Sequence, residues 1–197
     1  MARASRCHQF TRVLYHYDQL PPRFLLAVLP TLVLISVLFS LQNGRKWLSE
    51  LDIKMLTYLH VVRVPVELVL LGLYFSGGVP QIMTFEGRNF DILSGITAPF
   101  IVHYGIIQQR LSPILMLLWN IVCLLLLLNI VSIAILSAPF PFQQYSFDQP
   151  NIAILYFPFI WLPACIVPLV LFSHLVCIRF YCKEIITNKL QSNSFHY

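Results

Sequence analysis

The stretch ILMLLWNIVCLLLLLNIVSIAIL, residues 114–136, contains no charged side chain. It is longer than the roughly 20 residues that a helix needs to cross the hydrocarbon core of a bilayer. Residues 24–41 and 152–178 form two further apolar stretches. Because hydrocarbon offers no water to backbone groups, only helices and closed barrels can cross it. The sequence therefore predicts an all-α, polytopic transmembrane helical bundle.

The overall composition supports the same class. The 197 residues are 58% hydrophobic and 11% charged, whereas ordinary soluble domains have about 45–50% and about 25%. No stretch outside the apolar ones is long enough for a separate soluble domain. Residues 1–197 are thus predicted to form one multi-pass membrane domain, with an interfacial segment over 1–22 and a basic tail over 179–197.

The net charge of +5 comes largely from basic residues near both ends of the chain, which are Arg3, Arg6 and Arg12, and Arg179, Lys183 and Lys189. Such clusters are typical of contacts with anionic lipid headgroups and of topology signals. They are split between the ends and lack interleaved stacking aromatics, which argues against nucleic acid. The expected partners are membrane lipids, together with a second copy of the chain or a membrane partner subunit.

The number of spans depends on the middle of the sequence. The second predicted span, from Met55 to Phe75, contains Pro65. Proline removes a backbone donor, so this span is predicted to be bent or broken. Its amphipathic beginning near Trp47 is expected at the membrane interface. The third segment, Phe90 to Gln109, is close to the spanning length, which favours about five spans. If it only dips into the membrane, four spans remain and both basic ends lie on one side.

The charges along these segments predict both orientation and a site. Residues 137–151 lack lysine and arginine, so this loop is expected outside the cytoplasm and the basic tail inside. Arg63 and Glu67 stand four residues apart and share one helix face. A second charged cluster contains Glu86, Arg88 and Asp91, and Asn89 is a plausible N-cap of the third helix. Separate charges are costly in hydrocarbon.

We therefore expect the two clusters to converge inside the bundle, with Asp91 meeting Arg63 and Arg88 meeting Glu67. Such a site would bind or pass a small polar solute, a proton or a lipid headgroup. The alternatives are a membrane redox or enzyme subunit, and a structural partner subunit whose charged pairs only fix helix packing.

Catalytic, metal and cofactor motifs are not found in the sequence, so an enzyme is the less favoured class. The five cysteines contain no C-x-x-C spacing. His60, His103 and His174 fall in three different segments without the spacing of a metal or haem site. Asn120 and Asn129 are expected to hydrogen-bond between helices.

Several short motifs carry a resemblance. They are MTFEGRNFDILSGITAP, the Trp119-Asn120 pair, LSAP over residues 136–139, and FPFIWLPACIVPLVLFSHL. Over roughly Pro80 to Leu175 the chain resembles a loose group of small, uncharacterised bacterial polytopic membrane proteins. The resemblance implies a bacterial origin and a polytopic architecture, and it implies no activity.

Overall fold

The computed structural model describes residues 23–194, and all regular secondary structure in this range is helical. The predicted interfacial segment, residues 1–22, lies outside it. The longer helices are α2 (Arg23–Ser40), α3 (Gln42–Glu50), α4 (Ile53–Leu59), α5 (Arg63–Phe75), α6 (Ile92–Ile101), α7 (Pro113–Leu136) and α8 (Val167–Ser194). Three 3₁₀ turns, η1 (His60–Val62), η2 (Gln81–Met83) and η4 (Ala153–Leu155), and two π-helical segments, η3 (Val102–Ile107) and η5 (Leu162–Ile166), complete the fold.

Three helical stretches are long and apolar enough to cross a membrane: Ile53–Phe75, Pro113–Leu136 and Leu162–Gln191. A fourth candidate is the pair α2 and α3, whose axes differ by 94°. Ile92–Ile107 is a shorter apolar helix. The structure therefore contains three to four candidate spans within the described residues, and the predicted count of about five is not confirmed.

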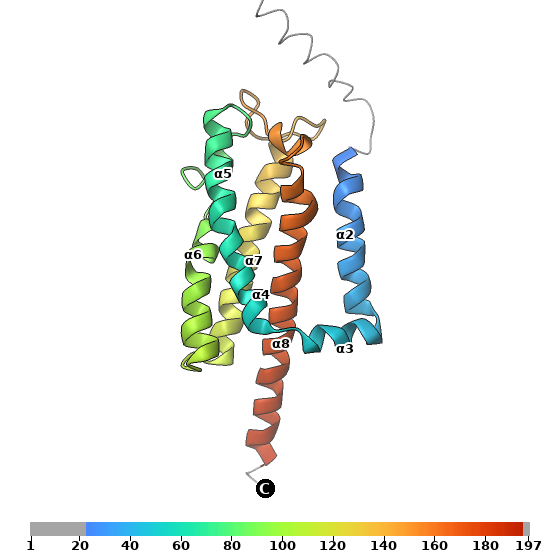
Figure 1. Cartoon of the computed structure of the whole chain (residues 1–197), viewed down its shortest axis with the longest axis vertical. Coiled ribbons are helices and arrows are strands. Elements are labelled where there is room, and N and C mark those ends of the chain that lie inside the picture. The colour runs from blue at the N-terminus through green and yellow to red at the C-terminus, as the bar shows by residue number, and fades with distance from the viewer. Residues whose placement is uncertain (1–22, 195–197) are drawn as a thin grey trace, which may run out of the picture.

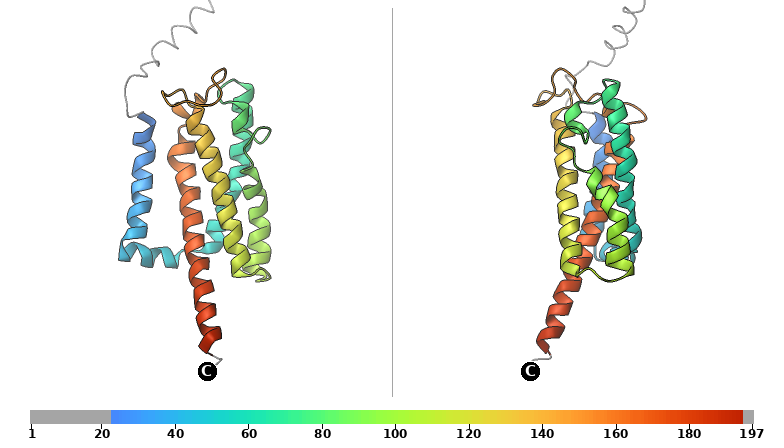
Figure 2. Two further views of the ribbon diagram at one scale, coloured as in Figure 1. Left: turned by 180° about the vertical axis from the view of Figure 1, so that it is seen from behind. Right: turned by 90° about the vertical axis from the view of Figure 1, so that its left-hand side faces the viewer.

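The long helices run between two ends of the molecule. α2 stands apart at one side, and α3 crosses one end of the bundle between α2 and α4 (Figure 1). We call this the α3 end. The connections over residues 76–91 and 137–152 gather towards the opposite end, the loop end, while α8 projects beyond the other helices at the α3 end (Figure 2).

The second span, predicted to be bent or broken, is not interrupted. α4, η1 and α5 follow one another without a gap and count as a single candidate span. Pro65 is the third residue of α5, directly after the 3₁₀ turn, where the change of hydrogen-bond pattern already interrupts the α-helical bonds that its missing N–H cannot make. The irregularity is confined to the 3₁₀ turn immediately before Arg63.

Helix starts explain the positions of the other elements. Ser112 is the N-cap of α7, and its side chain accepts a hydrogen bond from the Leu115 N–H at 3.3 Å, with Pro113 at the first helical position. α6 begins at Ile92 with Asp91 as N-cap residue, so the prediction of Asn89 as N-cap was wrong by two residues. The Asn89 side chain instead lies buried inside the bundle.

The core lies where α5, α7 and α8 meet. Its buried members include Leu70, Val79, Met83, Leu127, Ile130 and Val170. The outer surfaces of the same helices are also apolar, with Leu68, Leu118 and Leu125 each more than half exposed. A water-soluble protein rarely exposes so much contiguous apolar surface, whereas lipid accepts it. The surface is thus compatible with a membrane protein.

Candidate functional site

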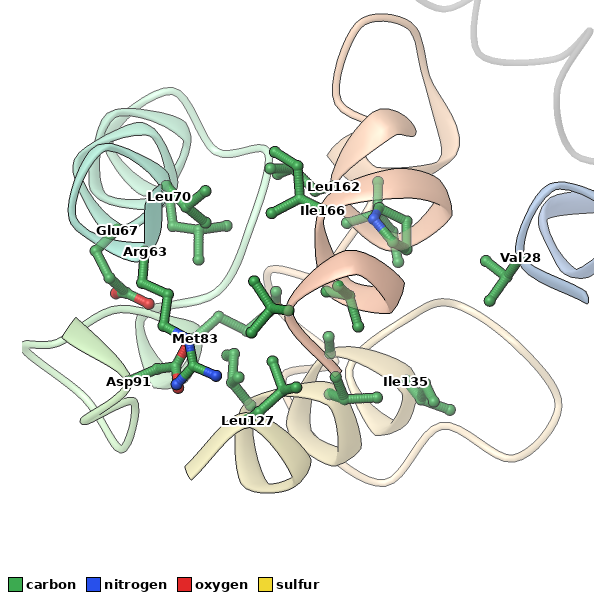
Figure 3. Close-up of a pocket in the computed structure, with 18 residues that line it drawn as sticks. Val28, Arg63, Glu67, Leu70, Met83, Asp91, Leu127, Ile135, Leu162 and Ile166 are labelled. Carbon is green, nitrogen blue, oxygen red and sulfur yellow. The ribbon is translucent and has the colours of Figure 1, made fainter. Parts of the chain in front are cut away.

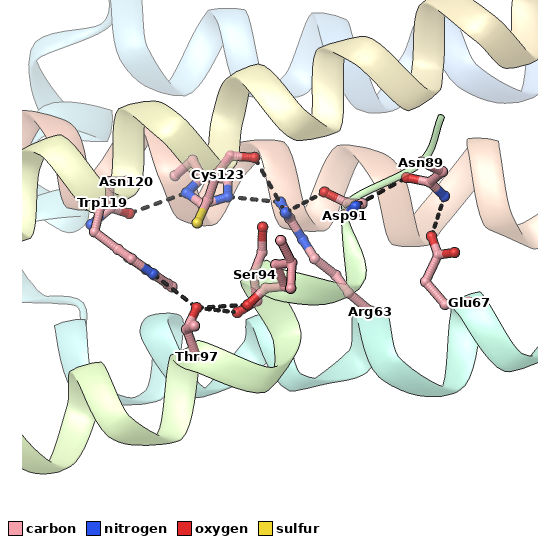
Figure 4. A network of polar contacts seen from close by, with 11 residues as sticks. Arg63, Glu67, Asn89, Asp91, Ser94, Thr97, Trp119, Asn120 and Cys123 are labelled. Carbon is pink, nitrogen blue, oxygen red and sulfur yellow. Dashed lines mark hydrogen bonds and ion pairs between the residues drawn. The ribbon is translucent and has the colours of Figure 1, made fainter. Parts of the chain in front are cut away.

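A buried ion pair lies at the centre of the bundle. Arg63, the first residue of α5, is 2% exposed, and Asp91, immediately before α6, is 6% exposed. Arg63 Nη1 donates to Asp91 Oδ1 at 2.6 Å (Figure 4). The predicted contact between these residues is present, and it joins two segments 28 residues apart in the sequence.

Arg63 also reaches the two long helices α7 and α8. Its Nη1 donates to the Cys123 carbonyl at 3.2 Å, and its Nη2 lies 2.7 Å from Nε2 of His174. A guanidinium has only donors, so His174 Nε2 accepts here and the ring is a neutral tautomer protonated on Nδ1. That Nδ1 then donates to Asn120 Oδ1 at 3.1 Å. The side chain of Arg63 therefore links elements from four parts of the bundle.

Glu67 lies one helical turn beyond Arg63 and is 1% exposed. Its Oε1 accepts a hydrogen bond from the Asn89 amide, which also donates to the Met83 carbonyl at 3.0 Å. Asn89 Oδ1 accepts from the Asp91 N–H at 3.1 Å, so one amide side chain holds both carboxylate residues in place (Figure 4). The predicted partner of Glu67, Arg88, does not make this contact.

The remaining two predicted site residues lie outside the cluster. Glu86 and Arg88 are exposed, and the described hydrogen bonds of Arg88 are made by its backbone: its carbonyl accepts from the Asn129 amide at 3.0 Å, and its N–H donates to the Ile82 carbonyl at 3.3 Å. Burial alternates over residues 88–91, because successive side chains point to opposite sides of this non-helical stretch. Asn89 and Asp91 point inward and Arg88 points outward. The structure thus brings together Arg63, Glu67 and Asp91 only.

Two buried histidines, His60 and His174, lie beside Arg63; with Arg63, Glu67, Asn89 and Asp91 they form what we call the buried polar layer. The rings of His60 and His174 stack with centroids 3.9 Å apart and planes at 17°. Ser173 Oγ donates to the Leu56 carbonyl at 2.7 Å, so its oxygen accepts from Nε2 of His60, 3.3 Å away. His103 lies elsewhere and contacts Gln108. Across residues 23–194, no group of three or more His, Cys, Asp or Glu side chains is arranged to hold a metal ion.

Sequence reasoning missed the roles of His60, Asn89 and His174. His60 had a usable signal, because residues 60, 63 and 67 form a polar stripe on one face of an otherwise apolar helix. Asn89 and His174 had none. Their partners lie 22 and 111 residues away in the sequence, and no local spacing indicates such contacts.

A cavity of about 140 Å³ adjoins the ion pair. Arg63, Glu67 and Asp91 contribute its polar lining, and the rest is apolar, with residues such as Leu70, Leu127 and Ile166 (Figure 3). Two buried polar atoms of this lining, Glu67 Oε2 and Arg63 Nε, have no hydrogen-bond partner among the described residues. Unpaired buried polar atoms are costly, so they mark a place where a further group could bind.

Comparison with known proteins gives a family. No curated protein and no solved structure matches the chain. A family described as a domain of unknown function (DUF8737) matches residues 20–181, which include α2 to α7, the N-terminal part of α8 and all members of the buried cluster. Since the match covers well over half of the sequence, the chain belongs to this DUF8737 family.

Proposed function

We propose that the chain is a multi-pass protein of a bacterial inner membrane that binds or passes a small polar group at a site formed by Arg63, Glu67 and Asp91. The group would be a small polar solute, a proton or a lipid headgroup. The observation that carries the proposal is the burial of three charged side chains beside a cavity whose other walls are apolar.

The charge balance favours a functional site over a purely structural one. Arg63 and Asp91 neutralise each other at 2.6 Å, and Glu67 adds a second carboxylate for the same single guanidinium. A charged residue at the centre of a transmembrane helix costs about 2.5–3.5 kcal/mol on insertion scales. A structural ion pair would not need Glu67. A proton on this carboxylate, or a ligand that hydrogen-bonds to it, gives a reason for its presence.

A second candidate function is that of a structural partner subunit. The observation in its favour is that both Nη atoms of Arg63 are used in contacts to α7, α8 and the start of α6. These contacts fix helix positions without any ligand. This candidate leaves Glu67 Oε2 and Arg63 Nε unexplained, so we place it second.

We further propose that five segments cross the membrane. α2, α4 with α5, α6 with η3, α7 and α8 alternate in direction between the two ends of the bundle (Figure 1). Ile92–Ile107 has 16 residues, about 24 Å at 1.5 Å per residue, against a hydrocarbon core of about 30 Å. Residues 88–91, which bury Asn89 and Asp91 against Glu67 and Arg63, would supply the remainder, because non-helical backbone is tolerated where protein covers it.

The site is tested by comparing wild-type protein with Glu67→Gln and Glu50→Gln variants. Glu50 is the matched control, because it is exposed at the end of α3. Each protein is purified in lipid nanodiscs, and its bound small molecules and lipids are quantified by mass spectrometry; proton leak is measured after reconstitution into liposomes with a pH-sensitive dye. We expect a compound or a proton leak that Glu67→Gln abolishes and Glu50→Gln preserves. Identical results for three folded proteins would favour the structural subunit.

A further inference from the structure

We propose that the cavity beside the ion pair binds a neutral amphiphile with a hydroxyl head group and a short apolar body. We call this space the amphiphile cavity. The inference rests on the proposed function, and it names the chemical class of the ligand for the same site.

The lining of the amphiphile cavity has two chemically different ends. Arg63, Glu67 and Asp91 lie together at one end, and Val28 of α2 lies at the other (Figure 3). Between them the walls consist of apolar side chains from α5, α7, η5 and α8, which include Leu70, Leu127, Ile130, Ile166 and Val170. A ligand that fills this space must therefore have one polar end and an apolar body directed towards α2.

The size of the cavity limits the apolar body. Its volume is about 140 Å³. An engineered apolar cavity of about 150 Å³ in another protein binds benzene. A body of roughly six carbon atoms is therefore expected to fit between the polar end and α2. A polyol or a sugar of this size would place its additional hydroxyl groups against apolar walls, where they would remain unpaired.

The polar end is suited to a hydroxyl group. Arg63 Nε carries a hydrogen and is a donor, whereas ionised Glu67 Oε2 is an acceptor, and both are buried without a partner. A hydroxyl group both donates one hydrogen bond and accepts hydrogen bonds. Its chemistry therefore matches both the free donor and the free acceptor. If Glu67 carries a proton on Oε2, the hydroxyl can accept from it instead.

Charged head groups of the same size fit less well. A carboxylate or phosphate only accepts hydrogen bonds, and it would meet the two carboxylates of Glu67 and Asp91 opposite a single guanidinium. An ammonium group only donates, so it would leave Arg63 Nε unpaired. The donor and acceptor at the polar end thus favour a neutral hydroxyl over either ion.

Direct labelling tests the inference. Four probes carry a photoreactive diazirine in a six-carbon chain and differ only in the head group: hydroxyl, ammonium, carboxylate, or none. Wild-type protein in lipid nanodiscs is irradiated with each probe, and the modified residues are identified by peptide mass spectrometry. We expect the hydroxyl probe to label Leu127, Ile130 or Val170 about tenfold more than the headless probe, the advantage that one to two net hydrogen bonds provide. Unlabelled 1-hexanol should compete with this labelling.

Variants separate the head group from the cavity walls. Glu67→Gln replaces the free acceptor Oε2 by a donor, so labelling by the hydroxyl probe should fall several-fold, whereas Glu50→Gln should leave it unchanged. Ala134→Leu fills part of the cavity from α7 and should reduce labelling by every probe. If Glu67→Gln does not fold, the competition by 1-hexanol in wild-type protein still decides.

Each other outcome overturns the inference in a distinguishable way. Preferential labelling by the ammonium or carboxylate probe, lost in Glu67→Gln, would reject the hydroxyl class and leave the proposed polar site intact. Equal labelling by all four probes, unchanged in Glu67→Gln and without competition by 1-hexanol, would reject both proposals and indicate a cleft filled by lipid acyl chains. Labelling confined to residues outside the amphiphile cavity would reject the cavity as the binding site.

Discussion

At the scale of single residues, Arg63 organises the interior of this bundle. Its guanidinium contacts Asp91, the Cys123 carbonyl and His174, and these contacts replace the water that would otherwise solvate its charge. Removing one partner of such a buried pair leaves the other charge uncompensated, whereas replacing both partners by apolar residues is often neutral. The stability of the protein should therefore depend on the pair more than on either residue alone.

This dependence gives a prediction for Asp91→Asn. The change removes the negative charge but keeps the shape, so buried Arg63 loses its ion-pair partner, and we expect the free energy of unfolding to fall by about 3–5 kcal/mol. Asp148→Asn is the control, because Asp148 is exposed in the loop over residues 137–152 and should change stability by less than about 0.5 kcal/mol. Unfolding in mixed micelles with increasing SDS measures both.

A double variant provides the contrasting case. Arg63→Leu combined with Asp91→Leu removes both charges, so it should be less destabilising than Asp91→Asn alone. If the double variant is instead less stable than both Asp91→Asn and Asp148→Asn, the contacts of Arg63 with His174 and Cys123 contribute more to stability than the neutralisation of charge does.

The residues of the site were only partly predictable from the sequence. The pair of Arg63 with Asp91 followed from the cost of isolated charges in hydrocarbon and from a short connection. The partner of Glu67 did not follow, because an uncharged amide, Asn89, takes the place expected for Arg88. Charge counting cannot distinguish these outcomes. Which of two neighbouring residues points inward depends on backbone geometry that no charge pattern records.

At the scale of the helices, long charge-free segments were the most predictable. The stretch 114–136 corresponds to α7 within one residue, because Ser112 and Pro113 define its start. The last helix was predicted from residue 152, but its regular part follows Pro158 and Pro163, and the segment before it forms a short turn and a π-helical piece. The third apolar segment yields a shorter helix, because residues 88–91 leave the helix to bring Asn89 and Asp91 to the site.

Close packing of α6 against η1 and α5 gives a second prediction. A Cβ atom at Gly95 would lie 2.8 Å from Val64 Cγ2 and 3.2 Å from the His60 carbonyl oxygen. Gly95→Ala should therefore displace α6 from the polar layer and destabilise the protein by about 1–3 kcal/mol, the usual cost of overpacking. Helices in membranes commonly approach each other at such small residues.

Gly72→Ala is the matched control for Gly95→Ala. Gly72 lies in α5, and a Cβ atom there would meet nothing within 4 Å. The change should be neutral or stabilise the helix by up to about 1 kcal/mol. Thermal unfolding of both variants in the same detergent measures the difference. Equal stability of the two would show that α6 can move away from α5 without cost.

At the scale of the whole molecule, the two ends differ in charge. Basic residues collect towards the α3 end, where they are Arg45, Lys46, Lys54, Arg110, Arg179, Lys183 and Lys189. The described part of the loop end carries Arg23, at the start of α2, and Arg88. Short loops rich in lysine and arginine remain in the cytoplasm. The folded distribution therefore supports the cytoplasmic tail and the external loop 137–151 that the sequence predicts.

This orientation is tested by two cysteine substitutions in a variant whose native cysteines are replaced. Gln144→Cys lies exposed in the loop at one end, and Thr187→Cys lies exposed on the part of α8 that projects beyond the bundle at the other. We expect a membrane-impermeant maleimide to label Gln144→Cys in intact cells and Thr187→Cys only after the cells are broken, because the α3 end carries seven basic side chains and such ends favour the cytoplasmic side. The opposite labelling pattern would show that the protein has the reverse orientation in the membrane. Labelling of both positions in intact cells would mean that an even number of segments separates them, and α8 would then not cross as one helix.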